Sequence, residues 1–262
     1  MECLPATDAF ELIIVPVKHY GLVRTLAEIV PRSGDAGFLL LTQNWRGIKE
    51  LDAILPSTRY IYGDAKAGGS FSGVTLAGAL KSIDIGSAEG ESSPLVAKVA
   101  SLFASAHIPA TLHSNMLHYL WVQYAITGGL WGALIQAGSF DAMLKDQDAA
   151  LAAFNAAREC LEVVRRRGVD VSRYGEAKPF LTDFALLRRF FIWLTMRMFR
   201  RDEYTKRCSA HAFNDPLEVK TFYDDLMETG QQLGVLMPVM ASFSQQIQRL
   251  EMRAVRTPSS SF

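Results

Sequence analysis

The chain has 262 residues, 49 % hydrophobic and 21 % charged, which excludes a disordered or fibrous protein and allows one large domain or two ordinary ones. Its 27 Lys and Arg residues balance its 27 Asp and Glu residues, and this zero formal charge argues against a protein that chiefly binds nucleic acid. Cys3, Cys160 and Cys208 are widely spaced and include no CxxC pair. We therefore expect neither a disulfide framework nor a zinc site.

The first ninety residues alternate between short apolar runs and helical patterns. Runs of apolar, β-branched or aromatic residues predict strands over 11–17, 37–42 and 59–62. Between them, apolar residues at helical spacing predict helices that prolines stop, over about 22–30 and 48–55. Residues 63–90 are rich in Gly and Ser with alternating apolar residues, including the run over 79–86, which indicates looser strands that can pair antiparallel. This βαβαβ pattern is typical of part of a doubly wound sheet.

From Ser93 onward the patterns predict helices throughout. Ser93 and Pro94 are a cap followed by proline at the first helical position. Further helices are expected over about 114–137, 141–167, 179–201, 215–233 and 238–255. The composition changes at 88–93, so we place the boundary between two domains there.

One segment of the helical half resembles a membrane span. Between Ile108 and Phe140 the chain has no Lys, Arg, Asp or Glu. The segment also contains His and Gln residues and lacks a flanking basic cluster, which favours a helix buried inside a helical domain over a spanning one. The N-terminal apolar run follows no basic leader, so we expect no signal peptide, a cytoplasmic location and no membrane partner.

The order of several segments resembles the ketopantoate reductase (2-dehydropantoate 2-reductase) family. The segments are ELIIVPVKHYG, LLLTQNWRGIKELDAILP, RYIYGDAKAGG and LEVKTFYDDLMETGQQLGVLMP, and the resemblance runs from Asp8 to Arg249. It implies a partial doubly wound, Rossmann-like α/β sheet over 1–90, part of a dinucleotide-binding domain. An all-α C-terminal domain over 91–262 would follow, of the type that ketopantoate reductase shares with 6-phosphogluconate dehydrogenase, for substrate binding and dimerisation.

The resemblance also implies an activity, the NADP-dependent transfer of hydride to a small 2-keto acid or a related carbonyl compound. Lys18 matches the family's lysine near the nicotinamide end of NADP, and Asn44 matches an asparagine that contacts cofactor and substrate. Glu218 matches the glutamate that supports the catalytic lysine and the cofactor. The family's members place the active site between their two domains.

The residue aligned with the family's catalytic lysine is different here. The segment YLWVQYAITGGL places Tyr119 at the lysine, Gln123 at the substrate-binding asparagine and Thr127 at a second asparagine. A tyrosine donates a proton in that role only if a nearby cation lowers its pKa from about 10. The alternative for Tyr119 is an aromatic residue that packs its helix.

A second departure concerns the dinucleotide. The family opens with a strand and G-x-G-x-x-G, whose glycines let the backbone approach the diphosphate. No two glycines of this chain are two positions apart. The chain aligns from the family's fourth strand onward, so we expect strand 11–17 to form a sheet edge. An apolar, β-rich edge invites pairing, and we predict that a second copy of the chain or its own N-terminus covers it.

These observations give two functional hypotheses. The first is a ketopantoate-reductase-like oxidoreductase, impaired or incomplete in this chain, and the alternative is a non-catalytic dimeric protein that binds or scaffolds. We expect a homodimer, a small carbonyl substrate, and no metal, because no two of the five histidines flank an acid at i, i+4 spacing. Residues 188–207 combine basic and aromatic side chains, which indicates either an anion-binding or membrane-surface helix or a solvated basic face.

Overall fold

A computed structural model describes residues 10–66, 69–71, 75–77, 81–90, 93–182, 185–199, 213 and 215–256. Contacts within the chain divide it into two compact units. The sheet unit comprises Met1–Ala67 and Leu80–Trp121, and the helical unit comprises Gly68–Ala79 and Val122–Phe262.

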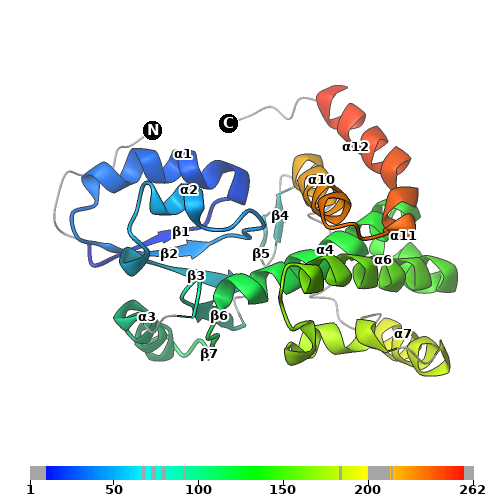
Figure 1. Cartoon of the computed structure of the whole chain (residues 1–262), viewed down its shortest axis with the longest axis horizontal. Coiled ribbons are helices and arrows are strands. Elements are labelled where there is room, and N and C mark those ends of the chain that lie inside the picture. Colours follow the sequence, from blue (N-terminus) through cyan, green and yellow to red (C-terminus); the bar gives the residue numbers. More distant parts are fainter. Residues whose placement is uncertain are drawn as a thin grey trace. The chain divides into compact units, whose positions relative to one another are not determined.

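The sheet unit is built on five strands in the order β1-β2-β3-β6-β7 (Figure 1). Their bounds are β1 Leu12–Val15, β2 Gly37–Leu41, β3 Tyr60–Ala65, β6 Ile83–Gly86 and β7 Ala110–Leu112. β1, β2 and β3 are parallel, β6 runs antiparallel to β3, and β7 is parallel to β6. This confirms the three predicted strands of the βαβαβ pattern and the antiparallel pairing predicted near 79–86, and among the described strands β1 lies at the sheet edge.

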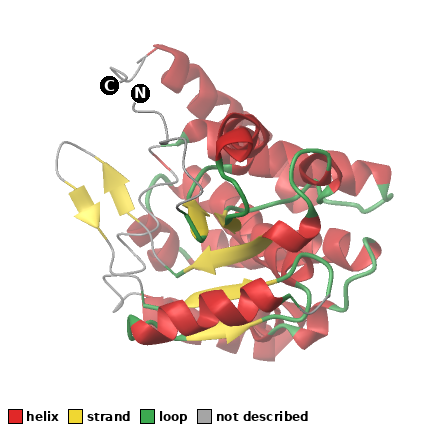
Figure 2. Ribbon diagram, turned by 90° about the vertical axis from the view of Figure 1, so that its left-hand side faces the viewer, coloured by secondary structure: helices red, strands yellow, loops and turns green. Residues whose placement is uncertain are grey.

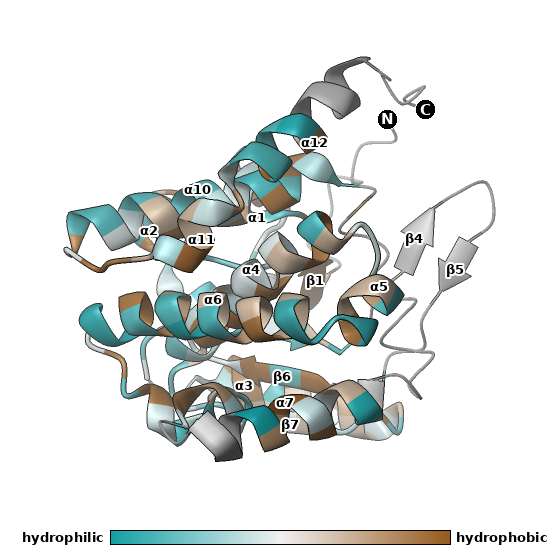
Figure 3. Ribbon diagram, turned by 90° about the vertical axis from the view of Figure 1, so that its right-hand side faces the viewer, coloured by the Kyte–Doolittle hydropathy of each residue, from teal (hydrophilic) through white to brown (hydrophobic). Residues whose placement is uncertain are grey.

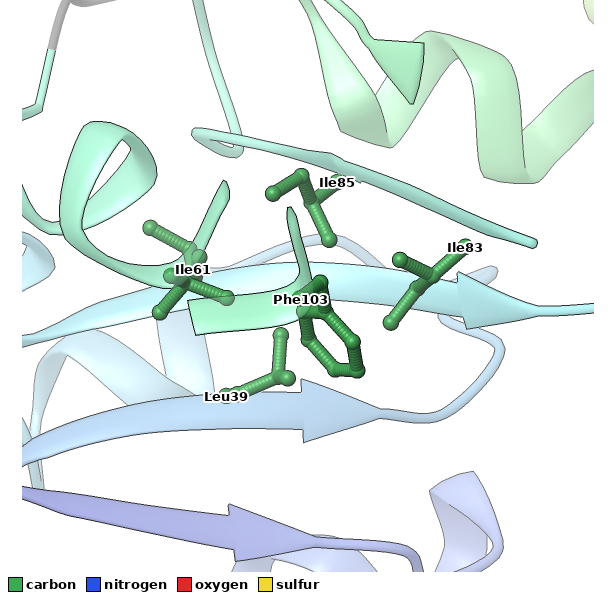
Figure 4. Close-up of a cluster of buried hydrophobic side chains, with 6 residues drawn as sticks. Leu39, Ile61, Ile83, Ile85 and Phe103 are labelled. Carbon is green, nitrogen blue, oxygen red and sulfur yellow. The ribbon is translucent and has the colours of Figure 1, made fainter. Parts of the chain in front are cut away.

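Helices cover both faces of this sheet. α1 (His19–Ile29), with the 3-10 turn η1 (Val30–Arg32), and α2 (Lys49–Asp52), followed by η2 (Ser57–Arg59), lie on one face, and α3 (Pro94–Ser105) lies on the other (Figure 1). Successive side chains of a strand point to opposite faces. On the α3 face they form a buried core with Phe103 and Val99 of α3 (Figure 4), contributed by Leu39, Ile61, Ile83 and Ile85.

The helical prediction from Ser93 onward is wrong over 110–112, where the chain forms β7. This strand has three residues and Leu112 is exposed, so it has no buried apolar periodicity that the sequence would reveal. A parallel neighbour for β6 requires a crossover, which α3 provides. The compact sheet unit therefore extends beyond the boundary expected at 88–93, to Trp121.

The helical unit packs around α4 (Met116–Ala137), which begins in the sheet unit. A Cβ at Gly128, Gly129 or Gly132 would overlap Leu226, the Ala157 backbone or Phe243, so these glycines let neighbouring segments approach α4 closely. The uncharged stretch is thus a buried core helix, as predicted. Among the described residues, no helix has both the length and the apolar character needed to cross a membrane.

Around α4 the chain forms short and long helices and one small hairpin. The helices are α5 Phe140–Lys145, α6 Gln147–Arg166, η3 Val171–Arg173, η4 Gly175–Leu181, α7 Ala185–Phe199, α10 Pro216–Gln232, α11 Pro238–Ser242 and α12 Ser244–Arg256. The strands β4 (Gly69–Phe71) and β5 (Thr75–Ala77) pair antiparallel (Figure 2). Hydrophobic and hydrophilic residues alternate along α6 with helical spacing (Figure 3), so one side of it is buried.

Three helices predicted as continuous are interrupted. The helix expected over 141–167 divides at Asp146, which has an extended backbone and accepts hydrogen bonds from the amides of Asp148 and Ala149. This N-cap fixes the start of α6. The helix expected over 238–255 divides at Phe243 into α11 and α12. Within 179–201 the chain forms the end of η4 and then α7, with 183–184 and 200–201 outside the described residues.

Candidate functional site

Three cationic or amide side chains follow the three parallel strands. Lys18 follows β1, Asn44 follows β2 and Lys66 comes directly after β3. Because the carboxyl ends of parallel strands meet at one edge of a sheet, these three positions share that edge. It is also the edge at which doubly wound sheets bind their ligands.

Lys66 is held in a polar cluster within the sheet unit. Its Nζ lies 2.8 Å from Asp64 Oδ2, 3.4 Å from Asp84 Oδ2 and 2.5 Å from Tyr119 Oη, to which it donates. Asp84 Oδ1 lies 2.6 Å from His113 Nε2. We call Asp64, Lys66, Asp84, His113 and Tyr119 the Lys66 cluster.

The fold brings these five residues together from four segments. Asp64 and Asp84 are direct partners in the antiparallel pairing of β3 with β6. His113 follows β7, and its amide donates to the Ile85 carbonyl at 3.0 Å. A Cβ at Gly86 would overlap the His113 backbone, so that glycine permits the approach. Tyr119 stands in the first turn of α4, and its ring packs on His113 with 4.0 Å between centroids.

Opposite charges hold the cluster's central groups in their ionised forms. Burial alone lowers the pKa of Lys66, but Asp64 and Asp84 together raise that pKa above its usual value. Burial raises the pKa of Asp84, but the hydrogen bond from His113 and the charge of Lys66 bring it below its usual value. Near neutral pH the cluster therefore contains an ammonium next to carboxylates.

The cluster's members differ in exposure, which decides what a ligand reaches. The Lys66 side chain is 36 % exposed, whereas Tyr119 is 0 % exposed and its hydroxyl faces Lys66. The cation that the proposed tyrosine acid requires is therefore present. A small molecule at this edge of the sheet would contact Lys66 rather than the phenol.

Asn44 uses its side chain inside the protein. Its Nδ2 donates to the Tyr62 hydroxyl at 2.7 Å and to the Gly47 carbonyl at 2.8 Å, while its Oδ1 accepts from the Gly47 amide at 3.0 Å. Gly47 has φ of 92°, in the region that favours glycine. Asn44 thus closes a turn after β2. Lys18 is the N-cap residue of α1 and makes no side-chain cap bond.

The other predicted site residues belong to the helical unit. Gln123 and Thr127 are four residues apart on α4, so they lie on one face of that helix. Gln123 Nε2 is buried and has no hydrogen-bond partner among the described residues. Glu218 is buried in the first turn of α10, where its amide donates to Asp215. The six predicted residues are therefore divided equally between the two units.

The described residues do not fit the diphosphate of a dinucleotide. A Rossmann site needs glycines two positions apart between a strand and a helix, where the backbone meets the diphosphate. The turn from β1 to α1 is Pro16-Val17-Lys18, and the turn from β2 to α2 has Gly47 as its single glycine. No part of the sequence has two glycines at that spacing. The described turns therefore provide no backbone site for the diphosphate of a nicotinamide cofactor.

Sequence reasoning missed most of the Lys66 cluster. Of its five residues only Tyr119 is a predicted site residue, and Lys66, Asp64, Asp84 and His113 are additions from the structure. A signal was present in GDAKAGG, where a charged pair stands at the carboxyl end of a buried strand. Charged residues at a strand's carboxyl end are candidates for a binding edge.

Comparison with known proteins identifies the fold. No protein-family model matches the chain, and a search of curated proteins finds no match. The 2-dehydropantoate 2-reductase from Geobacter metallireducens superposes with a TM-score of 0.68 at 15 % identity, covering 91 % of this chain and 77 % of that one. A dimeric ketopantoate reductase from Staphylococcus aureus gives 0.64 at 14 % identity, covering 93 % and 78 %.

A third similar structure has a different substrate class in its name. D-mandelate dehydrogenase, in a ternary structure with NADH and anilino(oxo)acetate, gives a TM-score of 0.70 at 14 % identity and covers 95 % of this chain and 79 % of that one. All three likenesses extend over nearly the whole chain. The chain therefore has the fold of the ketopantoate reductases, a Rossmann-like sheet followed by a helical domain.

Proposed function

We propose that this chain is a ketopantoate-reductase-like oxidoreductase component that binds a small 2-keto acid or a related carbonyl compound at Lys66. The observation that carries this proposal is the partly exposed side chain of Lys66, whose ammonium is held at the carboxyl end of β3 by Asp64, Asp84 and Tyr119. The fold supports the oxidoreductase class, because its solved examples include 2-dehydropantoate 2-reductase and D-mandelate dehydrogenase with NADH.

The chemistry of an ammonium suits a carbonyl oxygen. An ammonium has three donors, and around Nζ lie Asp64 and Tyr119 within 2.8 Å and Asp84 at 3.4 Å, so a ligand oxygen would join or replace one of these acceptors. A carbonyl oxygen that contacts Nζ would accept a charge-assisted hydrogen bond, which also stabilises negative charge that develops there. In this proposal Lys66 contacts the ligand, and Tyr119 positions Lys66.

The remaining predicted residues complete the proposal. Lys18 at the same sheet edge supplies a second positive charge for the carboxylate of a keto acid, and Asn44 shapes the turn beside it. Gln123, Thr127 and Glu218 stay predicted substrate or support residues, the first with a buried amide nitrogen available to a ligand. The family resemblance assigns NADP as the reductant. Because the described turns provide no site for a diphosphate, we propose binding of the keto acid and not of NADP.

Calorimetric titration with ketopantoate and with phenylglyoxylate tests the role of Lys66. Substituting Lys66→Met removes a charged hydrogen bond worth about 1.5–3 kcal/mol, so we expect affinity to fall by roughly ten- to a hundredfold. Lys66→Arg keeps the charge and is expected to retain part of the affinity. Lys49→Met, at an exposed lysine of α2, is the matched control and should leave binding unchanged. Equal affinity of Lys66→Met and the unmodified chain would rule out Lys66 as the ligand's contact.

The alternative function is a non-catalytic protein that binds or scaffolds, derived from the same fold. One observation favours it: no two glycines of the sequence have the spacing of the diphosphate loop. Titration with NADPH, followed by nicotinamide fluorescence, separates the two functions. A micromolar dissociation constant supports the oxidoreductase, whereas millimolar or undetectable affinity supports the non-catalytic protein.

A further inference from the structure

The helical unit contains a cavity of about 360 Å³ between α6 and α7. This volume is within the range of about 300–1,000 Å³ that small-molecule sites occupy. The last residue of α5 and the first turn of α6 contribute to its lining. The cavity is lined by Lys145, Gln147, Asp148, Leu151, Arg189, Ile192, Trp193, Met196 and Arg197.

The polar lining of this cavity is predominantly cationic. Lys145, Arg189 and Arg197 are all exposed, and among the described residues no carboxylate forms an ion pair with any of them. Asp148 is the single acid in the described lining, so three positive charges face one negative charge. Asp148 also belongs to the first turn of α6, where the positive end of the helix dipole adds to the local potential.

The apolar lining provides a floor and an aromatic wall. Ile192 and Met196 are buried, one turn apart on α7, and Leu151 faces them from α6. Trp193 is 50 % exposed, its ring stacks near Phe190 with 6.0 Å between centroids, and the Arg197 guanidinium carbon lies 5.6 Å from its centroid. The exposed half of this large aromatic side chain can contact a ligand in the cavity.

We propose that this cavity is a binding site for a small anion with an aromatic body, such as an aryl carboxylate or aryl sulfonate. The aromatic body packs between Trp193 and the floor of Ile192 and Met196, and the anionic group contacts Arg189, Arg197 and Lys145. The sequence pattern of the basic and aromatic segment 188–207, of which 200–207 lie outside the described residues, is compatible with a ligand site, a membrane-surface helix or a solvated face. The ligand site is favoured, because the described cations line a concave pocket.

This site is independent of the keto-acid proposal. Its described lining belongs entirely to the helical unit, whereas the Lys66 cluster belongs to the sheet unit. Loss of keto-acid binding on Lys66→Met therefore leaves this inference unaffected, and the reverse also holds.

Fluorescence titration with anilinonaphthalenesulfonate on the full chain tests the proposal. We expect saturable binding to one site that naphthalenesulfonate displaces and that naphthylmethylamine, an aryl cation, does not. Arg197→Gln is expected to weaken binding at least tenfold, because it removes both a charge and the cation beside the Trp193 ring. Arg24→Gln, at an exposed arginine of α1, makes the same change of charge elsewhere and should leave the titration unchanged.

Two further measurements keep the result interpretable. Trp193→Leu should also weaken binding of the probe, and circular dichroism of each variant should match that of the unmodified chain. Equal affinity of Arg197→Gln and Arg24→Gln would overturn the proposal. So would cosedimentation with phosphatidylserine vesicles that Arg197→Gln abolishes while binding of the free probe persists, since that result assigns the face to a membrane surface.

Discussion

In the Lys66 cluster, Asp84 contacts both His113 and Lys66. One of its oxygens lies 2.6 Å from His113 Nε2 and the other lies 3.4 Å from Lys66 Nζ. With 10 % of its side chain exposed, Asp84 has little water to replace either partner. A buried carboxylate is stable only when such partners compensate for its lost hydration. The geometry of Lys66 therefore depends on the ionisation of Asp84.

This dependence predicts how stability changes with pH. The pKa of Asp84 is lower in the folded chain than in the unfolded chain. Its ionised form therefore stabilises the fold fully at pH values above the unfolded-state pKa of about 3.9, and this stabilisation is lost as the pH falls through the lower pKa of the folded chain. Asp84→Asn should reduce the free energy of unfolding at pH 7 by about 1–3 kcal/mol, with a smaller reduction at pH 3. Urea unfolding at both pH values measures the difference.

Asp35→Asn, at an exposed aspartate, is the control for the change of charge. It should have no comparable effect at either pH. A reduction by Asp84→Asn of the same size at pH 3 as at pH 7 would show that ionisation of Asp84 does not stabilise the fold.

The sequence predicted one member of the cluster and missed four for a definable reason. Asp64 and Asp84 become neighbours only through the antiparallel register of β3 and β6, and His113 arrives through β7. Neither the local periodicity of the sequence nor a family motif predicts which residues of the two strands pair. Tyr119 occupies a position in a motif of the resembling family, which is why the sequence draws attention to it; the structure places the Lys66 ammonium beside its hydroxyl, and its role in catalysis stays a prediction.

Elements with strong periodicity were the most predictable. The strands near 11–17, 37–42 and 59–62 and the helix near 114–137 occur within a few residues of their expected bounds. The errors arose where a short element or a side-chain cap decided the structure, as at β7 and at Asp146. A single N-cap interrupts a helix even when apolar periodicity continues through it, because it satisfies amides that the next helix leaves free.

The packing of α4 against α6 depends on a glycine. A Cβ at Gly129 would overlap the backbone of Ala157, so no side-chain rotation relieves the contact. Gly129→Ala should lower the free energy of unfolding by about 1–3 kcal/mol through overpacking, although alanine favours helix by about 1 kcal/mol. Thermal and urea unfolding of the variant measure the loss.

Gly21→Ala provides the matched control, because Gly21 also lies in a helix and a Cβ at this position would meet no atom within 4 Å. This substitution should raise the free energy of unfolding by about 0.5–1 kcal/mol. If Gly129→Ala stabilised the protein to the same extent, the close approach of α4 and α6 would be excluded.

At the scale of the whole molecule, the feature with the largest consequence is the edge of the five-stranded sheet at β1. β1 pairs with β2 on one side, and no other described strand pairs with it. Ile14 on this strand is 45 % exposed. Apolar edge strands present unpaired amides and carbonyls that template further pairing. The prediction that this edge is covered therefore remains, with a second copy of the chain or residues 1–9 as the cover.

Light scattering combined with hydrogen exchange distinguishes the two covers. If a second copy pairs with β1, the chain is a dimer, and Ile14→Lys should convert it to monomer because an edge lysine opposes strand pairing. If residues 1–9 pair with β1, the chain is a monomer whose β1 amides exchange slowly, and deleting those residues should make them exchange rapidly. Ser57→Lys, which adds the same charge in η2, should change neither measurement. A monomer in which the outward amides of β1 exchange rapidly in the unmodified chain would contradict both forms of the prediction, and the edge would then be stable in water without a partner.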